Sequence, residues 1–197
     1  MSLLVVGVSH RSAPLHIVER ATVPREGVAG LLRAVQAAEP VSEALLLSSC
    51  NRVEVYAEVN RFHAAVTEIG RLLAEQVGLE LAELADHLYV HYDEPAVSHL
   101  FDVAAGLDSM VVGETQVLGQ LRAAYGLAQA EGTIGRRLHA VVQRALRTGR
   151  RVQAETGIAL AGASRITRGT VGVIKRNLGS EEGRVGDGGA GTGRRVR

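Results

Sequence analysis

EALLLSSCNRVEVYAEV, residues 43–59, contains two apolar segments on either side of a short polar joint at 48–52. Residues 45–47 form a continuous apolar run, which predicts a buried strand. Residues 53–59 alternate between valine or alanine and glutamate or tyrosine, a pattern typical of a strand with one buried face. The stretch therefore predicts two strands joined by a tight turn. That turn carries Cys50, the only cysteine of the chain.

The segments on both sides of this hairpin alternate between strands and helices. Continuous apolar runs predict further strands at 3–8 and 88–92. Apolar positions spaced by three or four predict helices at 25–38 and 62–77, with a weaker helix at 79–86. The order β-α-β-β-α-β is the split βαβ, ferredoxin-like pattern. We therefore expect an α+β domain whose antiparallel sheet carries helices on one face.

From Asp93 onward the pattern predicts a helical segment. The first helix follows Asp93 as its capping residue and ends at Gly106. Two more helices are expected at 113–130 and 133–156, with Gly132 as the break between them.

The last of these helices is strongly basic, because the sequence between Gly132 and Ala154 holds no acidic residue. Its six arginines are Arg136, Arg137, Arg144, Arg147, Arg150 and Arg151. Two interpretations stay open, namely a solvated helix face and a surface that contacts a polyanion.

Composition limits the classes of protein. The 197 residues carry a net charge of +1, so no overall field attracts nucleic acid. A single cysteine excludes an internal disulfide framework and fits a reducing cytosol. No apolar run approaches the ~18 residues of a membrane span. We therefore expect a cytoplasmic protein with no membrane association. Residues 166–178 favour a short helix, and the glycine-rich residues 179–197 are expected to be disordered.

Cys50 is the candidate nucleophile. A lone cysteine is most often a small buried apolar residue, but this one follows a buried strand in a polar turn. Arg52, two residues away, favours the reactive thiolate form. Asn51 and Arg52 together offer donors for a carboxylate, which a guanidinium can bind through two hydrogen bonds. The alternative for Arg52 is an ordinary surface charge.

Other polar residues are weaker candidates. The seven histidines lack the spacing of metal ligands, so no metal site is expected. His99 falls on the second turn of a predicted helix, as a packing residue or as an acid or base. Ser109, Glu114, Gln116 and Gln120 form a polar set, in which the two glutamines share a helix face. Exposed polar residues are the plain alternative for this set.

Four motifs resemble the N-terminal catalytic part of the glutamyl-tRNA reductase family. They are GVSHRSAP (7–14), LLLSSCNRVEVY (45–56), HLFDVAAGLDSMVVGETQVLGQ (99–120) and QRALRTGRRVQAETGI (143–158). The family pattern around the thiol is S-T-C-N-R-T-E, and here Ser49 and Val53 replace the two threonines. The resemblance implies NADPH-dependent reduction of glutamyl-tRNA(Glu) to glutamate-1-semialdehyde through a thioester on Cys50. This reaction is the first step of tetrapyrrole biosynthesis.

The resemblance also implies a set of site residues and partners. Cys50 and His99 are expected to be catalytic. The residues expected to line the glutamyl pocket are Ser49, Asn51, Arg52, Ser109, Glu114, Thr115, Gln116 and Gln120. The partners implied are glutamyl-tRNA(Glu), a second copy of the chain in a homodimer, and glutamate-1-semialdehyde aminomutase.

The C-terminal part departs from the family pattern. Gly189, Ala190 and Gly191 fall where the family begins to bind NADPH, but the apolar strand that should precede them is glycine-rich here. We expect a catalytic domain at 1–158, the start of a linker helix at 159–178 and a remnant of the NADPH-binding domain at 179–197. A truncation or frameshift would leave only the acyl-transfer half of the chemistry.

Two other classes remain as alternatives. One is a non-catalytic RNA-binding module built on a ferredoxin-like sheet, although such sheets usually stack bases on exposed aromatics, which are scarce here. The other is a generic thiol esterase, which would need a histidine oriented against Cys50.

Overall fold

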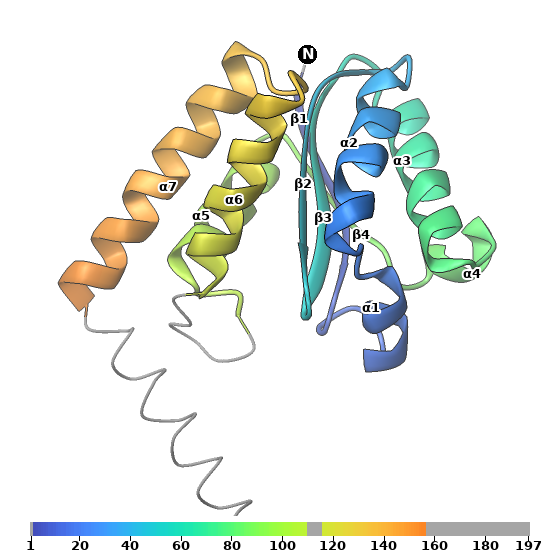
Figure 1. Ribbon diagram of the computed structural model, residues 1–197, viewed down its shortest axis with the longest axis horizontal. Coiled ribbons are helices and arrows are strands. Elements are labelled where there is room, and N and C mark those ends of the chain that lie inside the picture. Colours follow the sequence, from blue (N-terminus) through green and yellow to red (C-terminus); the bar gives the residue numbers. More distant parts are fainter. Residues whose placement is uncertain (1, 110–115, 157–197) are drawn as a thin grey trace, which may run out of the picture.

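The computed structural model describes residues 2–109 and 116–156 and has a four-stranded sheet at its centre (Figure 1). The strands are β1 (Ser2–Ser9), β2 (Val41–Ser49), β3 (Arg52–Val59) and β4 (Tyr89–Tyr92). They lie in the order β2-β3-β1-β4, and every neighbouring pair is antiparallel. This order confirms the ferredoxin-like topology predicted from the sequence.

One face of the sheet is covered by the helices that come between its strands. They are α1 (Leu15–Ala21), α2 (Arg25–Ala37), α3 (Phe62–Val77) and α4 (Leu81–Ala85). The helices α2, α3 and α4 match the predicted ones. The helix α1 was not predicted, because its seven residues are too few to show a helical period. Its inward residues Ile17, Val18 and Ala21 nevertheless join the core.

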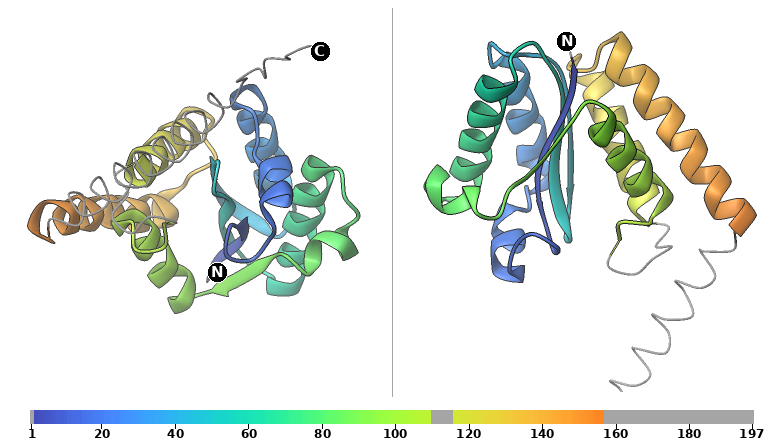
Figure 2. Two further views of the ribbon diagram at one scale, coloured as in Figure 1. Left: turned by 90° about the horizontal axis from the view of Figure 1, so that it is seen from below. Right: turned by 180° about the vertical axis from the view of Figure 1, so that it is seen from behind.

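The opposite face is covered by a second helical layer (Figures 1 and 2). It consists of α5 (Glu94–Ala105), α6 (Gln116–Ala130) and α7 (Arg136–Thr156). The helices of the ferredoxin-like unit therefore lie on one face as predicted, and the helical segment that follows, which the sequence did not place, covers the other face. The prediction that β3 is half buried was wrong, because all eight of its residues are buried, including Glu54 and Glu58. The polar positions of β3 face this second layer instead of water.

Helix ends follow the predicted glycines. Gly106 and Gly132 both have positive φ, at 76° and 69°, which is the left-handed conformation that favours glycine. The predicted start of α6 at 113–115 and the predicted segments at 159–178 and 179–197 lie outside the described residues. Among the helices that the structure describes, none combines the length and the apolar composition needed to cross a membrane.

Helix α7 is fixed at both ends of its buried face. At its N-terminus, the backbone N–H groups of Arg137 and Leu138 donate to the Glu43 carboxylate, at 3.2 and 2.7 Å. An acidic side chain at this end also complements the helix dipole. Further along, Gly149 lies directly against the carbonyl oxygen of Ala104 at the end of α5.

We predict that Gly149→Ala destabilises the protein by about 1–3 kcal/mol, because the new Cβ would overlap the Ala104 carbonyl and push α7 away from α5. Gly126→Ala in α6 is the matched control, since a Cβ there meets nothing within 4 Å. The control should leave stability unchanged or raise it by about 0.5–1 kcal/mol. Urea denaturation of the three proteins measures both effects, and equal stabilities would contradict the packing argument.

Candidate active site

The turn that carries Cys50 is held by the side chain of the residue before it. Ser49 Oγ accepts a hydrogen bond from the Asn51 N–H at 3.3 Å and donates to the Arg52 carbonyl at 3.4 Å. This local bond closes the two-residue connection between β2 and β3. Cys50 is a free thiol and is exposed at the tip of the turn.

Neighbouring loops hold the same turn from outside. The His10 N–H donates to the Asn51 carbonyl at 3.0 Å. The Thr22 hydroxyl donates to the Ser49 carbonyl at 3.1 Å, and the Ser48 hydroxyl accepts from the Val23 N–H at 3.0 Å. The backbone around Cys50 is therefore a fixed platform.

A small pocket lies beside this platform. Its lining residues come from the β2–β3 turn, the segment after α5 and the first turns of α6, and they are Ser49, Asn51, Arg52, Ser109, Val117 and Gln120. The structure thus brings five of the predicted substrate residues together. Gln116 is exposed and does not line this pocket. Glu114, Thr115, Gly189, Ala190 and Gly191 lie outside the described residues.

Arg52 is buried, with only 2 % of its side chain exposed, which rules out the alternative of a surface charge. Its Nη1 donates to Glu54 Oε1 at 2.8 Å and to Asp108 Oδ2 at 2.9 Å, and its Nη2 donates to the Asp108 carbonyl at 2.5 Å. Burial alone would lower the pKa of Arg52, but Glu54, Tyr89 and Asp108 raise it above its ordinary value. The guanidinium is thus fixed in the pocket wall by two carboxylates.

Glu54 is the centre of this buried network and is fully inaccessible to solvent. Besides Arg52, the hydroxyls of Tyr56 and Tyr89 donate to it at 2.5 Å each, and His99 Nε2 lies 3.0 Å from Glu54 Oε1. Burial opposes ionisation, but the hydrogen bond from His99 and the charge of Arg52 outweigh it and lower the pKa of Glu54 to about 2. Glu54 is therefore a carboxylate at neutral pH.

Gly7 makes room for this network. It pairs with Glu54 on one side of β1 and with Tyr89 on the other. A Cβ at Gly7 would lie 2.9 Å from Glu54 Cγ and 3.0 Å from the Tyr89 ring. The glycine of the GVSHRSAP motif thus allows the Tyr89 hydroxyl to reach Glu54.

His99 lines a second pocket next to the network, together with Ser9, Arg11, Ser12, Tyr89, His91 and Asp108. Arg11 Nη1 binds Asp108 Oδ1 at 2.9 Å, so Asp108 bridges two arginines. The His91 ring stacks on His99 with 4.6 Å between the ring centroids. Burial, and then the neighbouring His99, lower the pKa of His91. The structure thus links His99 to Arg52 through Glu54.

Sequence reasoning missed Glu54, Asp108 and Tyr89. The alternating pattern assigned Glu54 to a solvent-facing side of β3. Asp108 lies in a loop after the helix that ends at Gly106, and no motif pointed to it. The ligand atoms of Glu54, His99 and Asp108 lie within 4.8 Å of one another, as metal ligands would. However, Arg52 Nη1 already contacts both carboxylates, so the guanidinium supplies the positive charge at this place.

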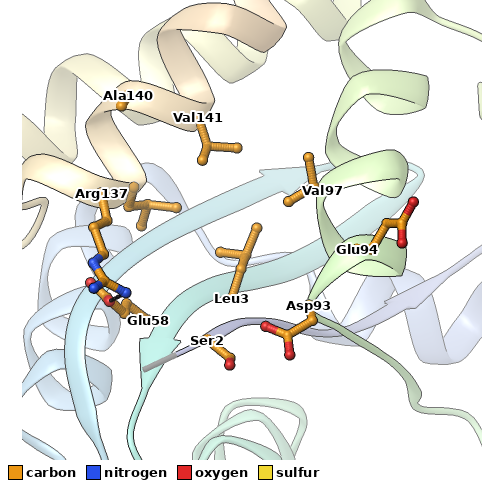
Figure 3. A pocket seen from close by; sticks show the side chains of 10 residues that line it. Ser2, Leu3, Glu58, Asp93, Glu94, Val97, Arg137, Ala140 and Val141 are labelled. Atoms are coloured by element: carbon orange, nitrogen blue, oxygen red, sulfur yellow. Dashed lines mark ion pairs between the residues drawn. The ribbon is translucent and has the colours of Figure 1, made fainter.

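A larger, mostly apolar pocket lies at the opposite end of the sheet (Figure 3). Leu3, Val97 and Val141 face into it, and the ion pair between Arg137 and Glu58, at 3.0 Å, closes one side. Burial, and then the nearby Glu43, raise the pKa of Glu58. Because β3 runs from Arg52 to Glu58 along its length, this pocket is remote from Cys50.

The fold and the site define an α+β domain that presents a free cysteine on a rigid turn beside a polar pocket. A family model described as the N-terminal domain of glutamyl-tRNAGlu reductase matches residues 6–156. The chain therefore belongs to the glutamyl-tRNA reductase family.

Individual relatives agree with this assignment. A glutamyl-tRNA reductase of Streptomyces avermitilis is 55 % identical over 169 residues, which cover 86 % of this chain and 30 % of the relative. A glutamyl-tRNA reductase 1 of a Nocardioides species is 49 % identical, over 88 % of this chain and 42 % of the relative. The solved glutamyl-tRNA reductase from Methanopyrus kandleri matches with a TM-score of 0.63 at 32 % identity, over 78 % of this chain and 35 % of that one. The chain thus spans less than half the length of these relatives.

Proposed function

We propose that residues 6–156 carry out the acyl-transfer step of a glutamyl-tRNA reductase. In this step Cys50 takes the glutamyl group from glutamyl-tRNA(Glu). The observation that carries the proposal is the pocket at the Cys50 turn, which gathers Ser49, Asn51, Arg52, Ser109 and Gln120 from separate motifs. Its volume is about 10 Å³, so its hydroxyl, amide and guanidinium groups would hydrogen-bond a small polar acyl group at the mouth of the pocket.

The chemistry follows from an exposed thiol beside this pocket. The Cys50 thiolate attacks the ester carbonyl carbon, so an S–C bond forms and the C–O bond to the terminal ribose of the tRNA breaks. The ribose oxygen takes up a proton as it leaves. The product is a glutamyl thioester on Sγ. Attack by water on the thioester would release glutamate and restore the thiol.

The buried network has two roles in this proposal. Glu54 and Asp108 hold the Arg52 guanidinium in the pocket wall, where its remaining N–H groups can bind the substrate carboxylate. His99 acts on the reaction as an acid or base at the neighbouring pocket, while its bond to Glu54 fixes the orientation of its ring.

The whole family reaction adds a hydride step. When bound, NADPH would supply the hydride that reduces the thioester to glutamate-1-semialdehyde for tetrapyrrole synthesis, with cleavage of the C–S bond and release of the Cys50 thiol. Gly189, Ala190 and Gly191 stay the predicted contacts, and no described residue is assigned to NADPH. The resemblance also predicts a cytoplasmic location, a homodimer and an aminomutase partner. It likewise predicts that the glutamyl pocket includes Glu114, Thr115 and Gln116.

The two alternative classes, an RNA-binding module and a generic thiol esterase, have less support than acyl transfer. A base-stacking RNA module needs an open sheet face, and helices cover both faces here. A generic thiol esterase needs a histidine that activates Cys50, whereas His99 Nε2 contacts Glu54. The esterase reaction is therefore a side reaction of the proposed thioester and has no separate support.

Trapping the thioester tests the proposal. Radiolabelled glutamyl-tRNA(Glu) is mixed with the purified chain without NADPH, and the protein is precipitated with acid. We expect label on the protein that hydroxylamine releases, at a peptide containing Cys50. A chain that hydrolyses or binds the substrate but never carries label would contradict the proposal.

A further inference from the structure

The arginines of α7 form one continuous face on the outside of the second helical layer. All six are exposed, at positions 136, 137, 144, 147, 150 and 151. At 100° per residue they fall within a sector of about 140°, and the stripe is about 22 Å long. The buried residues Leu138, Val142 and Leu146 lie on the opposite side of the helix. We call these six residues the arginine face.

Most of the arginine face has no acidic partner. Arg137 pairs with Glu58, and Arg151 pairs with Glu155 at 2.9 Å. Within the described ranges 2–109 and 116–156, no ion pair involves Arg136, Arg144, Arg147 or Arg150. Elsewhere in the described ranges, the exposed Arg33, Arg61 and Arg71 are each paired with a glutamate, whereas the exposed Arg25 and Arg122 are in no ion pair. The arginine face differs from these single positions by its density, because six exposed arginines share one side of a helix with no acidic residue between positions 136 and 151.

The C-terminal half of the arginine face lies at the same end of the second layer as the candidate site. Gly149 contacts Ala104, which is five residues before Ser109 in the chain, and Leu118, which follows Val117. Ser109 and Val117 both line the pocket next to Cys50. The unpaired Arg144, Arg147 and Arg150 surround Gly149 in sequence, on the outer side of the helix. A long polyanion can thus contact α7 while its end reaches the pocket.

We propose that the arginine face binds the phosphate backbone of an RNA helix. Resting on the proposed function, that RNA is the body of the glutamyl-tRNA whose 3′ end reaches Cys50. Guanidinium groups without internal partners bind phosphates and release the counterions condensed on RNA, which gives affinity without sequence selectivity. The near-zero net charge of the chain conceals this local concentration of positive charge.

The test uses uncharged tRNA(Glu) and the purified full chain, with affinity measured over a series of salt concentrations. The test variant combines Arg144→Gln, Arg147→Gln and Arg150→Gln. The matched control removes the same charge from the other helical layer, through Arg33→Gln, Arg61→Gln and Arg71→Gln. We expect the test variant to bind about tenfold or more weakly at low salt, with a log–log salt slope shallower by about two to three. The control should retain most of the affinity and the slope.

Each outcome decides the question. Unchanged affinity and slope in the test variant would overturn the proposal and leave an acidic protein as the partner to seek. Equal losses in both variants would also overturn it, because only net charge would then matter. Circular dichroism confirms that both variants fold. Uncharged tRNA carries no glutamyl group and does not react, so this assay measures binding alone. Failure of the proposed function is detected separately, by the absence of labelled thioester in the trapping experiment.

Discussion

Cys50→Ser should abolish transfer of the glutamyl group to the protein, with a loss of at least about 10³-fold in the rate of labelling from glutamyl-tRNA(Glu). A serine hydroxyl is protonated at neutral pH and needs a base beside it. The candidate acid or base, His99, has its Nε2 bound to Glu54 at 3.0 Å. Samples of the reaction are quenched with acid at successive times, and the label that stays on the protein gives the rate.

The Cys50 variant has a simple control for folding. The Cys50 side chain is exposed, and the bonds that hold its turn come from Ser48, Ser49, Asn51 and Thr22. We therefore expect the free energy of unfolding to change by no more than about 0.5 kcal/mol. Cys50→Ala serves as a second variant that lacks any nucleophile. Glutamate release that continues unchanged in both variants would show that Cys50 is not the nucleophile.

Arg52→Met should lower the free energy of unfolding at neutral pH by about 3–5 kcal/mol, because it leaves the fully buried Glu54 carboxylate without its cation. Arg61→Met is the control, since Arg61 is exposed and its pair with Glu39 lies at the surface. The control should change stability by less than about 1 kcal/mol. Combining Arg52→Met with Glu54→Gln should recover part of the loss, since the buried charge is then removed as well.

The dependence of stability on pH provides a second measurement of the same pair. Glu54 has a folded pKa of about 2 against an ordinary value of 4.5, so its contribution is present above pH 4.5 and is lost as pH falls towards 2. The loss is of order 3 kcal/mol for a shift of this size. Arg52→Met removes one of the groups that lower this pKa and leaves the hydrogen bond from His99, so the acid-side loss should shrink but not vanish. An identical pH profile in wild type and variant would contradict the role assigned to Arg52.

Apart from the short helix α1, the elements of the first 92 residues could be predicted because each one has its own periodic or continuous apolar signal. Their order then determined the ferredoxin-like topology. The second layer could not be placed, because an apolar helix stripe shows that a face is buried but not against which surface. The alternation in β3 had the same ambiguity, since a glutamate on a strand usually indicates a solvent-exposed face. Here Glu54 is buried and forms an ion pair with Arg52.

The candidate site was predicted in part for a similar reason. Local reasoning reached Cys50, Asn51 and Arg52, which are adjacent in the chain. It also marked Ser109 and Gln120 as members of a polar set. The resemblance added Ser49 and assigned all three to the glutamyl pocket, and the structure places them beside the same turn. Asp108 contacts Arg52 across 56 positions of sequence, and no local pattern reports a contact of that kind.

The coverage of both sheet faces also determines the smallest fragment of this protein that can be produced in a folded state. A fragment ending at Tyr92 contains the complete ferredoxin-like topology, yet it would expose Glu54, Tyr56 and Arg52 along one side of the sheet. Without Asp108 and His99, two of the groups that balance the buried charges would be missing. Fragments produced for structural or screening work should therefore extend through α7. The recognisable fold and the autonomous folding unit have different boundaries in this chain.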